Sequence, residues 1–245
     1  MKSLKMDVHT HTVASGHAYS TLKEMAIAAA DKGLELLGVT EHGPGIPGTC
    51  STMYFRNIRS IPRDKWGVEL MIGAEVNITD YSGTLDMDED LLKRLDLRIA
   101  GIHKYCYTFG TPEENTAAVV NAIKNPWVDI ISHPDDGKCG FDYDALAKAA
   151  EENEVLLELN NNSLHPAMHR KNVFENNVAL LLACKKRNLP VIIDSDAHIE
   201  FMIGECDRAY EVVKAADFPE ELIINNDVEA FKALIKRKHA KVSVK

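Results

Sequence analysis

The stretch of sequence that decides the fold is Asp7-Val8-His9-Thr10-His11, which His17 follows after a short gap. Its apolar and β-branched residues predict a short strand, in which successive side chains point to opposite faces. We therefore expect His9 and His11 to point the same way, with Asp7 beneath them and the residues between them on the other face. Two neighbouring imidazoles at the end of a strand suit the coordination of a metal ion. A single H-x-H motif is also typical of surface histidines, so this interpretation depends on what ends the later strands.

The composition is that of an ordinary globular protein, because 45% of the 245 residues are hydrophobic and 27% are charged. The length suits one large α/β barrel or two small domains. No apolar run approaches the ~20 residues of a membrane-spanning helix, and the N-terminus lacks the apolar core of a signal peptide. We therefore expect a cytoplasmic protein with no membrane partner. The five cysteines are scattered without a C-x-x-C pair, which disfavours a disulfide framework and a cysteine zinc site.

The charge balance argues against a nucleic-acid partner, because nucleic-acid surfaces are normally basic and this chain has a net charge of -9. The one basic run, Lys236-Arg237-Lys238-His239, falls at the end of a predicted helix. There it complements the helix dipole, so we expect a solvated helix end rather than a binding patch.

Predicted strands and helices alternate along the chain. Strands are expected at residues 7–11, 34–40, 68–76, 95–102, 128–132, 155–159 and 191–194. Helices are expected at residues 20–33, 115–124, 142–153, 172–187, 205–216 and 228–238, a long loop at 43–62 and a small hairpin at 79–84. This alternation predicts a parallel sheet with helices outside it. No repeat or composition break marks a boundary, so residues 1–245 are expected to form a single domain.

Metal-binding residue types fall at the end of every predicted strand. They are His9 and His11, His42, Glu75, His103, His133, Asn160, and Asp196 with His198. An open doubly wound sheet gathers ligands mainly at one switch point, whereas a closed barrel brings all strand ends to one mouth. The distribution therefore favours an α/β fold of the TIM-like (β/α)7 barrel type.

The residue types at these strand ends indicate transition metals. Neutral imidazoles with carboxylates are typical of zinc, manganese or iron sites, because calcium prefers oxygen ligands alone. Seven histidines, one glutamate and one aspartate exceed what one tetrahedral ion can use, so two or three ions with a bridging carboxylate fit better. Sites of this kind activate water and hold the oxygens of a phosphoryl group during in-line displacement. The chain has no Walker-type phosphate loop, so nucleotide-driven transfer has little support.

Six short motifs, in this order along the chain, resemble those of the PHP (polymerase and histidinol phosphatase) family of metallo-phosphoesterases. They are Asp7-Val8-His9-Thr10-His11, Thr40-Glu41-His42-Gly43, Gly73-Ala74-Glu75, Ala100-Gly101-Ile102-His103, Ile131-Ser132-His133-Pro134 and Asp194-Ser195-Asp196-Ala197-His198. Residues 14–21 and 158–161 also resemble the YcdX-type branch of small stand-alone phosphatases. The resemblance covers nearly the whole chain and implies a distorted barrel of seven strands. One departure is Glu41, where that branch often has aspartate.

The resemblance also implies a site of three metal ions, with zinc expected and manganese or iron as alternatives. His9, His11, Glu75 and Asp196 would hold the first ion, Glu75 would bridge to a second ion on His103 and His133, and His17, His42 and His198 would hold the third. A metal-bound hydroxide would attack phosphorus. Glu75 and Asp196 would tune that hydroxide as ligands, which makes these two the expected catalytic residues.

The leading hypothesis is a metal-dependent phosphatase that hydrolyses a small phosphate monoester. Histidinol phosphate is one candidate substrate. Two alternatives are a hydrolase of the amidohydrolase kind, which attacks a carbonyl group, and a metal-binding subunit without activity. Three ions rather than one or two would favour phosphate, and the complete ligand set argues against an inactive subunit. The oligomeric state is open, and a homo-oligomer is compatible with the sequence.

Other polar residues carry weaker functional signals. We expect Asp7 to orient His9 or His11 as a hydrogen-bond acceptor, and His165 and His169 to be surface residues. Basic side chains can bind phosphate oxygens. The four candidates for this role are Arg59, Arg63, Lys104 and Arg170. We expect each of them to be a solvated surface residue, and Arg170 is the strongest candidate for binding phosphate.

Overall fold

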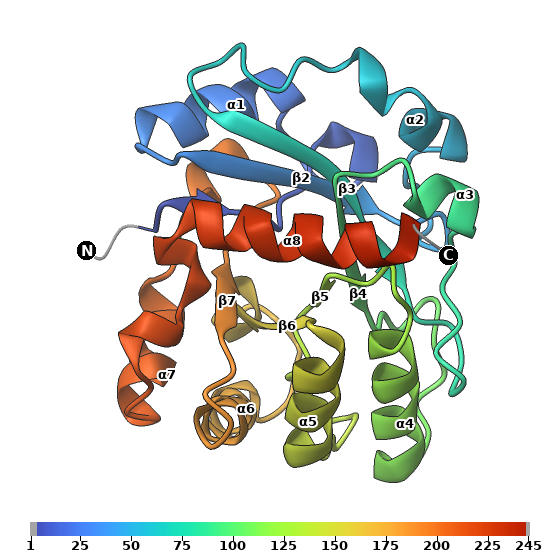
Figure 1. Cartoon of the computed structure of the whole chain (residues 1–245), viewed down its shortest axis with the longest axis vertical. Helices are drawn as coiled ribbons and strands as arrows, with labels where there is room; N and C mark the ends of the chain where they lie inside the picture. The colour runs from blue at the N-terminus through green and yellow to red at the C-terminus, as the bar shows by residue number, and fades with distance from the viewer. Residues whose placement is uncertain (1–3, 244–245) are drawn as a thin grey trace.

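Seven parallel strands form a nearly closed barrel in the computed structural model, which describes residues 4–243 (Figure 1). Each strand pairs with its neighbours in sequence, so the order in the sheet is the order along the chain. This arrangement confirms the predicted (β/α)7 TIM-like barrel. The strands are β1 (Met6–Asp7), β2 (Leu36–His42), β3 (Glu69–Asn77), β4 (Leu97–Gly101), β5 (Ile130–Ile131), β6 (Leu156–Asn160) and β7 (Val191–Asp194).

Within residues 4–243, no continuous ladder of backbone hydrogen bonds joins β1 to β7. Only a few separate contacts close the barrel at this seam. Beyond the strands, Thr10 and Ala197 form an isolated parallel bridge, and the His11 N–H donates to the Ala197 carbonyl oxygen at 2.8 Å. Nearer the strands, a side chain replaces the backbone partner, because the Val8 N–H donates to Asp194 Oδ1 at 2.7 Å. The Asp194 side chain is fully buried. The seam therefore depends in part on a buried carboxylate.

The first strand is shorter than predicted, and this changes which way its side chains point. Met6 and Val8 both belong to the apolar cluster inside the barrel. Asp7 lies on the other face, where its carboxylate accepts hydrogen bonds from the backbone and hydroxyl of Ser195. Regular strand structure ends at Asp7, so the alternation does not extend to His9. The expectation that Asp7 lies beneath the two histidines of the motif is therefore wrong.

Helices surround the barrel, and most of the predicted ones begin and end within a few residues of the expected positions. They are α1 (Leu22–Asp31), α2 (Thr52–Arg56), α3 (Glu89–Leu92), α4 (Pro112–Ile123), α5 (Tyr143–Asn153), α6 (Val173–Lys185), α7 (Asp207–Ala215) and α8 (Val228–Ser243). Reciprocal hydrogen bonds begin two of these helices, because Thr21 and Glu24 form a capping box at α1 and Thr111 and Glu114 form one at α4.

The connections that follow β2 and β3 hold more structure than predicted. The expected loop at 43–62 contains helix α2, whose Phe55 is fully buried. The short helix α3, which follows β3, is also absent from the sequence-based expectation. The small hairpin at 79–84 is present, because the Thr79 N–H donates to the Thr84 carbonyl oxygen at 2.9 Å.

Helix α8 covers the end of the barrel at which the strands begin, opposite the ends that carry the predicted ligands (Figure 1). Its Val228, Phe231 and Ile235 pack against a cluster made largely of the first residues of the strands. That cluster comprises Met6, Val8, Leu36, Leu97, Ile99, Ile130, Leu156 and Ile192. Because apolar side chains fill this end, a ligand must enter the barrel from the other end.

The basic run at the end of α8 is only partly solvated, which corrects the prediction of a solvated helix end. Lys238 is buried and donates a hydrogen bond to the Val128 carbonyl oxygen, and His239 Nε2 lies 3.0 Å from Asp129 Oδ1. The buried guanidinium of Arg98 contacts the same Asp129 carboxylate. These side chains dock α8 onto the polar groups that precede β5.

Replacing Asp129 with alanine should lower the free energy of unfolding by about 3–5 kcal/mol, because it leaves the buried Arg98 guanidinium without its carboxylate. Arg98 Nη1 lies 3.5 Å from Asp129 Oδ2. Chemical denaturation measures the change. The control is Lys232→Ala on α8, which breaks surface pairs with Glu69 and Glu229 and should cost less than about 1 kcal/mol. Equal losses in the two variants would contradict the role given to Asp129.

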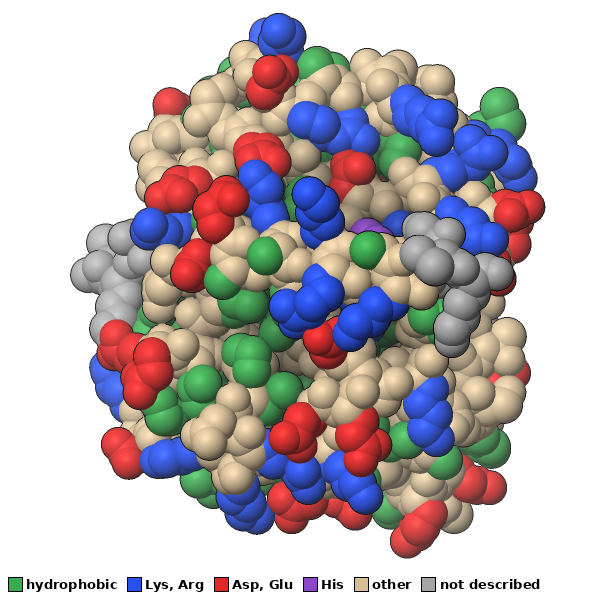
Figure 2. Space-filling model, viewed as in Figure 1, with side chains coloured by type: hydrophobic (Ala, Val, Ile, Leu, Met, Phe, Trp, Pro, Cys, Tyr) green, Lys and Arg blue, Asp and Glu red, His purple; other side chains and the backbone are tan. Residues whose placement is uncertain are grey.

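Basic and acidic side chains are mixed on the face of the molecule that Figure 2 shows. Lys232 on α8 pairs with Glu69, and both Arg237 and Lys241 pair with Glu154. The basic side chains of α8 therefore do not form a continuous positive patch on this face. In residues 4–243, no helix is both long enough and apolar enough to cross a bilayer.

Candidate metal centre

The nine side chains predicted as metal ligands gather at the mouth of the barrel, where the strands end. His42 and Glu75 are register partners on β2 and β3, and His103 and His133 follow β4 and β5. A network of contacts, each no longer than 3.3 Å, connects the complete set. The set is His9, His11, His17, His42, Glu75, His103, His133, Asp196 and His198.

The first predicted ligand group lies in the buried centre of the cluster. His9 Nε2 is 3.1 Å from His11 Nε2 and 3.3 Å from Glu75 Oε2. His11 Nε2 is 3.2 Å from Asp196 Oδ1. All four side chains are buried, so two imidazoles and two carboxylates face one another with little access to water.

The Glu75 carboxylate divides its two oxygens between different groups of histidines. Oε2 faces His9 and lies 2.8 Å from His42 Nδ1. Oε1 lies 2.8 Å from His133 Nε2 and 3.3 Å from His103 Nε2. One oxygen on each side is the arrangement that a bridging carboxylate requires.

The third group lies at the outer edge of the cluster. His17 Nε2 is 3.2 Å from His42 Nε2 and 3.2 Å from His198 Nε2. His17 is exposed, whereas His42 is buried and directs its other nitrogen at Glu75. The donor atoms of His42, Glu75 and His103 lie within 4.8 Å of one another, so His42 stands between the second and third groups.

Outward hydrogen bonds leave the Nε2 lone pairs of four histidines pointing into the cluster. Each of these imidazoles contacts an oxygen through Nδ1, so the neutral form carries its proton there and leaves Nε2 free to bind a metal ion. The four contacts are His9 with Glu158 at 2.6 Å, His103 with Asn77 at 2.8 Å, His17 with the Ser15 carbonyl at 3.1 Å and His198 with the Asp196 carbonyl at 3.0 Å.

Three observations show that the residues fit metal ions. Facing imidazole nitrogens lie 3.1 to 3.2 Å apart, close to the roughly 3.3 Å expected of two nitrogens on one tetrahedral zinc ion. His42 Nδ1, Glu75 Oε2 and Asp196 Oδ1 are buried, and although His42 Nδ1 lies 2.8 Å from Glu75 Oε2, none of the three atoms forms a hydrogen bond of suitable geometry with a described residue. Finally, a Cβ atom at Gly101 would lie 2.2 Å from Ser132 Oγ and 3.4 Å from Glu75 Oε1, so glycine keeps this space open.

Glu158, to which the sequence assigned no role, holds two parts of the cluster in place. Its Oε1 lies 2.6 Å from His9 Nδ1, and its Oε2 accepts a hydrogen bond from the His133 N–H at 2.6 Å. Glu158 therefore takes the orienting role that was expected of Asp7. A glutamate among leucines in a buried strand is the signal that could have identified it, because an unpaired carboxylate is rarely buried.

Glu41 lies outside the ligand cluster but supports one of its members. Its Oε2 accepts a hydrogen bond from Ser15 Oγ at 2.6 Å, and Ser15 Oγ lies 3.2 Å from His11 Nδ1. The Thr12 N–H also donates to Glu41 Oε2 at 3.1 Å. Glu41 thus orients His11 through Ser15.

Burial and mutual proximity shift the pKa values of the cluster in different directions. Although burial acts to raise them, the pKa values of Glu75 and Asp196 are held well below their usual range by the surrounding histidines. Although burial acts to lower it, the pKa of His9 is held well above its usual value by the three carboxylates around it. Burial and the Arg170 guanidinium lower the pKa of His133 to about 3. The cluster therefore concentrates negative charge at Glu75 and Asp196, where a cation is stabilised.

Two candidate ligands have the left-handed backbone conformation that residues other than glycine rarely adopt. The φ angles are 32° at His133 and 51° at Asp196. Each residue lies just beyond the end of its strand, where the turn directs the side chain into the mouth. Conformations of this kind cost stability and cluster at functional sites.

The four basic candidates differ in where they lie. Arg170 and Lys104 line a cavity beside His133, and Arg170 Nη1 donates to the His133 carbonyl oxygen at 3.2 Å and to Asp135 Oδ1 at 2.9 Å. Arg63 instead pairs at 2.7 Å with an aspartate that precedes β4, near the opposite end of the barrel. The fourth candidate, Arg59, is exposed after α2.

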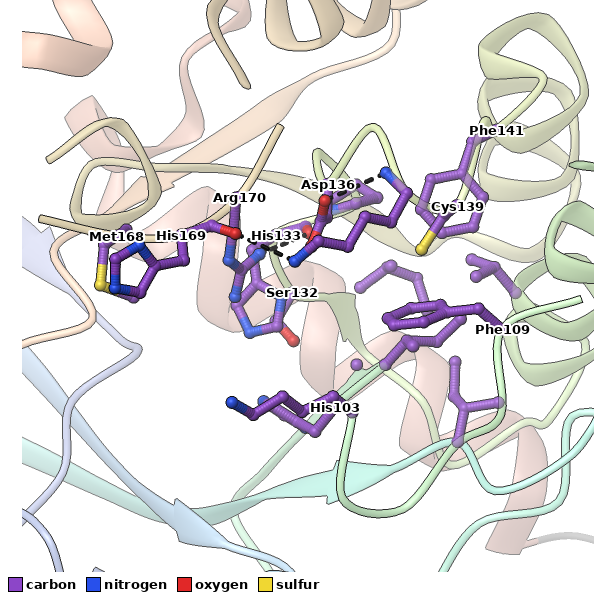
Figure 3. Close-up of a pocket in the computed structure, with 18 of the residues that line it drawn as sticks. His103, Phe109, Ser132, His133, Asp136, Cys139, Phe141, Met168, His169 and Arg170 are labelled. Atoms are coloured by element: carbon purple, nitrogen blue, oxygen red, sulfur yellow. Dashed lines mark hydrogen bonds and ion pairs between the residues drawn. The ribbon is translucent and has the colours of Figure 1, made fainter. Parts of the chain in front are cut away.

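The two histidines expected at the surface lie in the loop that follows β6. His165 Nδ1 accepts a hydrogen bond from the Ala167 N–H at 3.1 Å. His169 is exposed and lines the same cavity as Arg170, next to which Figure 3 shows it. The exposure of His169 agrees with the expectation, whereas His165 is only partly exposed.

Comparison with known proteins finds relatives along nearly the whole chain. A family model described as "PHP domain" matches residues 7–237. A protein named "Probable phosphatase" from Acetivibrio thermocellus is 44% identical over 97% of each chain, and one from Clostridium novyi is 44% identical over 95% of each. The solved structure of histidinol phosphate phosphatase from Lactococcus lactis, complexed with zinc, L-histidinol and phosphate, has a TM-score of 0.59 and 17% identity. That match covers 88% of this chain and 94% of the other, and it shows a shared fold.

Proposed function

Because the chain belongs to the PHP domain family, we propose that it is a metal-dependent phosphatase that hydrolyses small phosphate monoesters. The observation that carries this proposal is the single connected cluster of seven histidines, Glu75 and Asp196 at the barrel mouth. The names of the relatives, and the zinc and phosphate bound by the Lactococcus lactis enzyme, support it.

The proposed site holds three metal ions, for which zinc fits the donor set and manganese or iron are alternatives. Glu75 belongs to two of the three ligand sets, because its two oxygens face different histidines. The sets are His9, His11, Glu75 and Asp196 for the first ion, Glu75, His103 and His133 for the second, and His17, His42 and His198 for the third.

When bound, such ions lower the pKa of a water molecule and stabilise negative charge on phosphoryl oxygens. The residues of the chain fix where this chemistry takes place. Glu75 and Asp196 are the catalytic residues of the proposal, because their oxygens face the centre of the buried ligand group. Glu158 contacts both His9 and the backbone of His133, so it fixes the position of the first ligand set relative to the second.

Arg170 is the residue that we assign to binding of the phosphate group. One nitrogen of its guanidinium is anchored by Asp135 and the His133 carbonyl, which orients the side chain beside the ligand cluster. Although burial opposes it, Asp135 raises the pKa of Arg170, so the guanidinium stays charged. Its remaining N–H groups suit the oxygens of a phosphoryl group.

The remaining alternatives have less support. Histidinol phosphate is a substrate candidate, but the Lactococcus lactis enzyme shares only 17% of its sequence with this chain. An amidohydrolase-type reaction at a carbonyl group would not need a third group of histidines. A subunit without activity would not need all nine ligand positions to be occupied by suitable residues.

The test is a panel of phosphate monoesters assayed on protein whose metal content is measured in the same sample. We expect turnover and about two to three transition-metal ions per chain, because the cluster offers more ligands than one ion can use. One ion or none, even when metal is supplied during expression, would contradict the three-metal site. Full metal content without turnover of any phosphate ester would contradict the phosphatase.

A further inference from the structure

A cavity of about 350 Å³ opens directly beside the ligand cluster (Figure 3). His103 and His133 form part of its wall, and Arg170 lines it as well. Its size lies at the lower end of the range for small-molecule sites. A phosphate group held at the cluster would therefore place the rest of the substrate, which is the alcohol that leaves, next to this cavity.

The wall of the cavity farther from Arg170 is apolar. Phe109 and Phe141 line it together with Ile78 and Val119, and Figure 3 shows the two phenylalanines on the side away from Arg170. Both rings are only half-buried, although they pack against the core. Half-buried rings at the wall of a cavity offer apolar surface that a flat ligand can remove from water.

The charged groups that line the cavity are mostly positive. Arg170, Lys104 and Lys138 line it, against the single carboxylate of Asp136. Asp136 is already engaged, because Lys138 Nζ lies 3.5 Å from its Oδ2 and the Lys138 N–H donates to its Oδ1. Lys104 lies over the Tyr105 ring and forms no ion pair within residues 4–243. Because Arg170 and Lys138 are paired with Asp135 and Asp136, a cationic leaving group would meet one lysine without an ion pair, Lys104, and no free carboxylate among the lining residues.

We propose that this cavity binds the leaving group of the substrate and selects a neutral aromatic alcohol over a small or cationic one. The inference rests on the proposed phosphatase function and adds to it the class of ester. In the reaction, a water oxygen forms a bond to phosphorus and the bond from phosphorus to the alcohol oxygen breaks. A proton from the water ends on the alcohol, so the products are inorganic phosphate and the free alcohol.

The experiment compares three phosphonates that cannot be hydrolysed, measured by calorimetry on the zinc-loaded protein. Benzylphosphonate should bind at least about tenfold more tightly than methylphosphonate, because it adds one apolar ring to the same anionic group. Aminomethylphosphonate should bind no more tightly than methylphosphonate, because the cavity has no free carboxylate to receive its ammonium group.

Substitutions of the two phenylalanines test whether the cavity causes the preference for benzylphosphonate. Phe109→Ala and Phe141→Ala should each remove most of the preference for benzylphosphonate and leave methylphosphonate binding unchanged, which also shows that the protein is folded. The control is Phe201→Ala, because Phe201 is 71% exposed and does not line the cavity. Equal binding of benzyl- and methylphosphonate, loss of the preference in Phe201→Ala alone, or tighter binding of aminomethylphosphonate would overturn the proposal.

Turnover of benzyl phosphate and methyl phosphate separates this inference from the proposed function, because the two alcohols are similar leaving groups. A higher kcat/KM for benzyl phosphate than for methyl phosphate supports both the phosphatase function and the leaving-group inference. Turnover of both esters at equal kcat/KM overturns the leaving-group inference and keeps the phosphatase. If neither ester is hydrolysed while benzylphosphonate is still preferred, the phosphatase fails and the preference of the cavity stands.

Discussion

Replacing Glu75 with glutamine should abolish phosphatase activity and lower the content of bound metal at the same time. The two Glu75 oxygens face different histidines, with Oε2 at 3.3 Å from His9 Nε2 and Oε1 at 2.8 Å from His133 Nε2. Glutamine has the same shape, but it removes the negative charge and replaces one oxygen by an NH₂ group that cannot bind a cation. Because one carboxylate serves two ligand groups, a single substitution should weaken two ions together.

The control for Glu75→Gln is the same substitution at a glutamate of β3 that lies far from the ligand cluster. Glu69 at the start of β3 is exposed and pairs with Lys232, so Glu69→Gln should keep full activity and metal content. Elemental analysis and turnover are measured on both variants, and circular dichroism checks the fold. A Glu75→Gln protein that kept both its metal and its activity would remove Glu75 from the site.

Replacing His103 or His133 should cost metal affinity and most of the activity, whereas replacing His165 or His169 should leave the bound metal unchanged. His103 and His133 both contact Glu75 Oε1 from the ends of adjacent strands. Loss of a residue that only supports a ligand typically costs ~10–100-fold in affinity or activity, so loss of a ligand should cost at least as much.

The choice of substitution matters at His133, because its backbone φ is 32°. Asparagine tolerates this conformation better than alanine, so His133→Asn tests the ligand without adding backbone strain. His103 has no such constraint, and His103→Ala is suitable. His169 lines the cavity, so His169→Ala should have at most a modest effect on substrate binding. Loss of metal from His169→Ala but not from His133→Asn would contradict the interpretation of the strand ends.

The features that repeat along the chain could be predicted from the sequence, because each carries a local signal. Every strand combines an apolar run with a metal-binding residue type at its end, and strands alternate with helices of ordinary length. That repetition is enough to predict the barrel. His42 and Glu75, for example, are predicted independently, and the register of β2 with β3 then places them opposite each other.

The features that could not be predicted depend on residues far apart in the sequence. Glu158 lies 149 residues from His9, so the local sequence of neither reveals that they touch. The burial of Lys238 depends on where the last helix docks, because an isolated helix would leave this residue in water. The short length of β1 follows from its ladder with β2, which pairs only Met6 and Asp7 with residues of β2, and no local pattern encodes where that pairing stops.

The seam between β1 and β7 has a consequence for the order in which the barrel opens. It joins the first strand to the last strand, because Val8 and Asp194 are 186 residues apart, and closing so long a loop carries a large entropic cost. The proposed ligands lie on both sides of it, with His9 and His11 on one edge and Asp196 on the other. An ion bound by ligands from both edges would hold β1 and β7 together where no continuous backbone ladder joins them. We therefore expect chelators to free the first and last strands before the rest of the sheet unfolds.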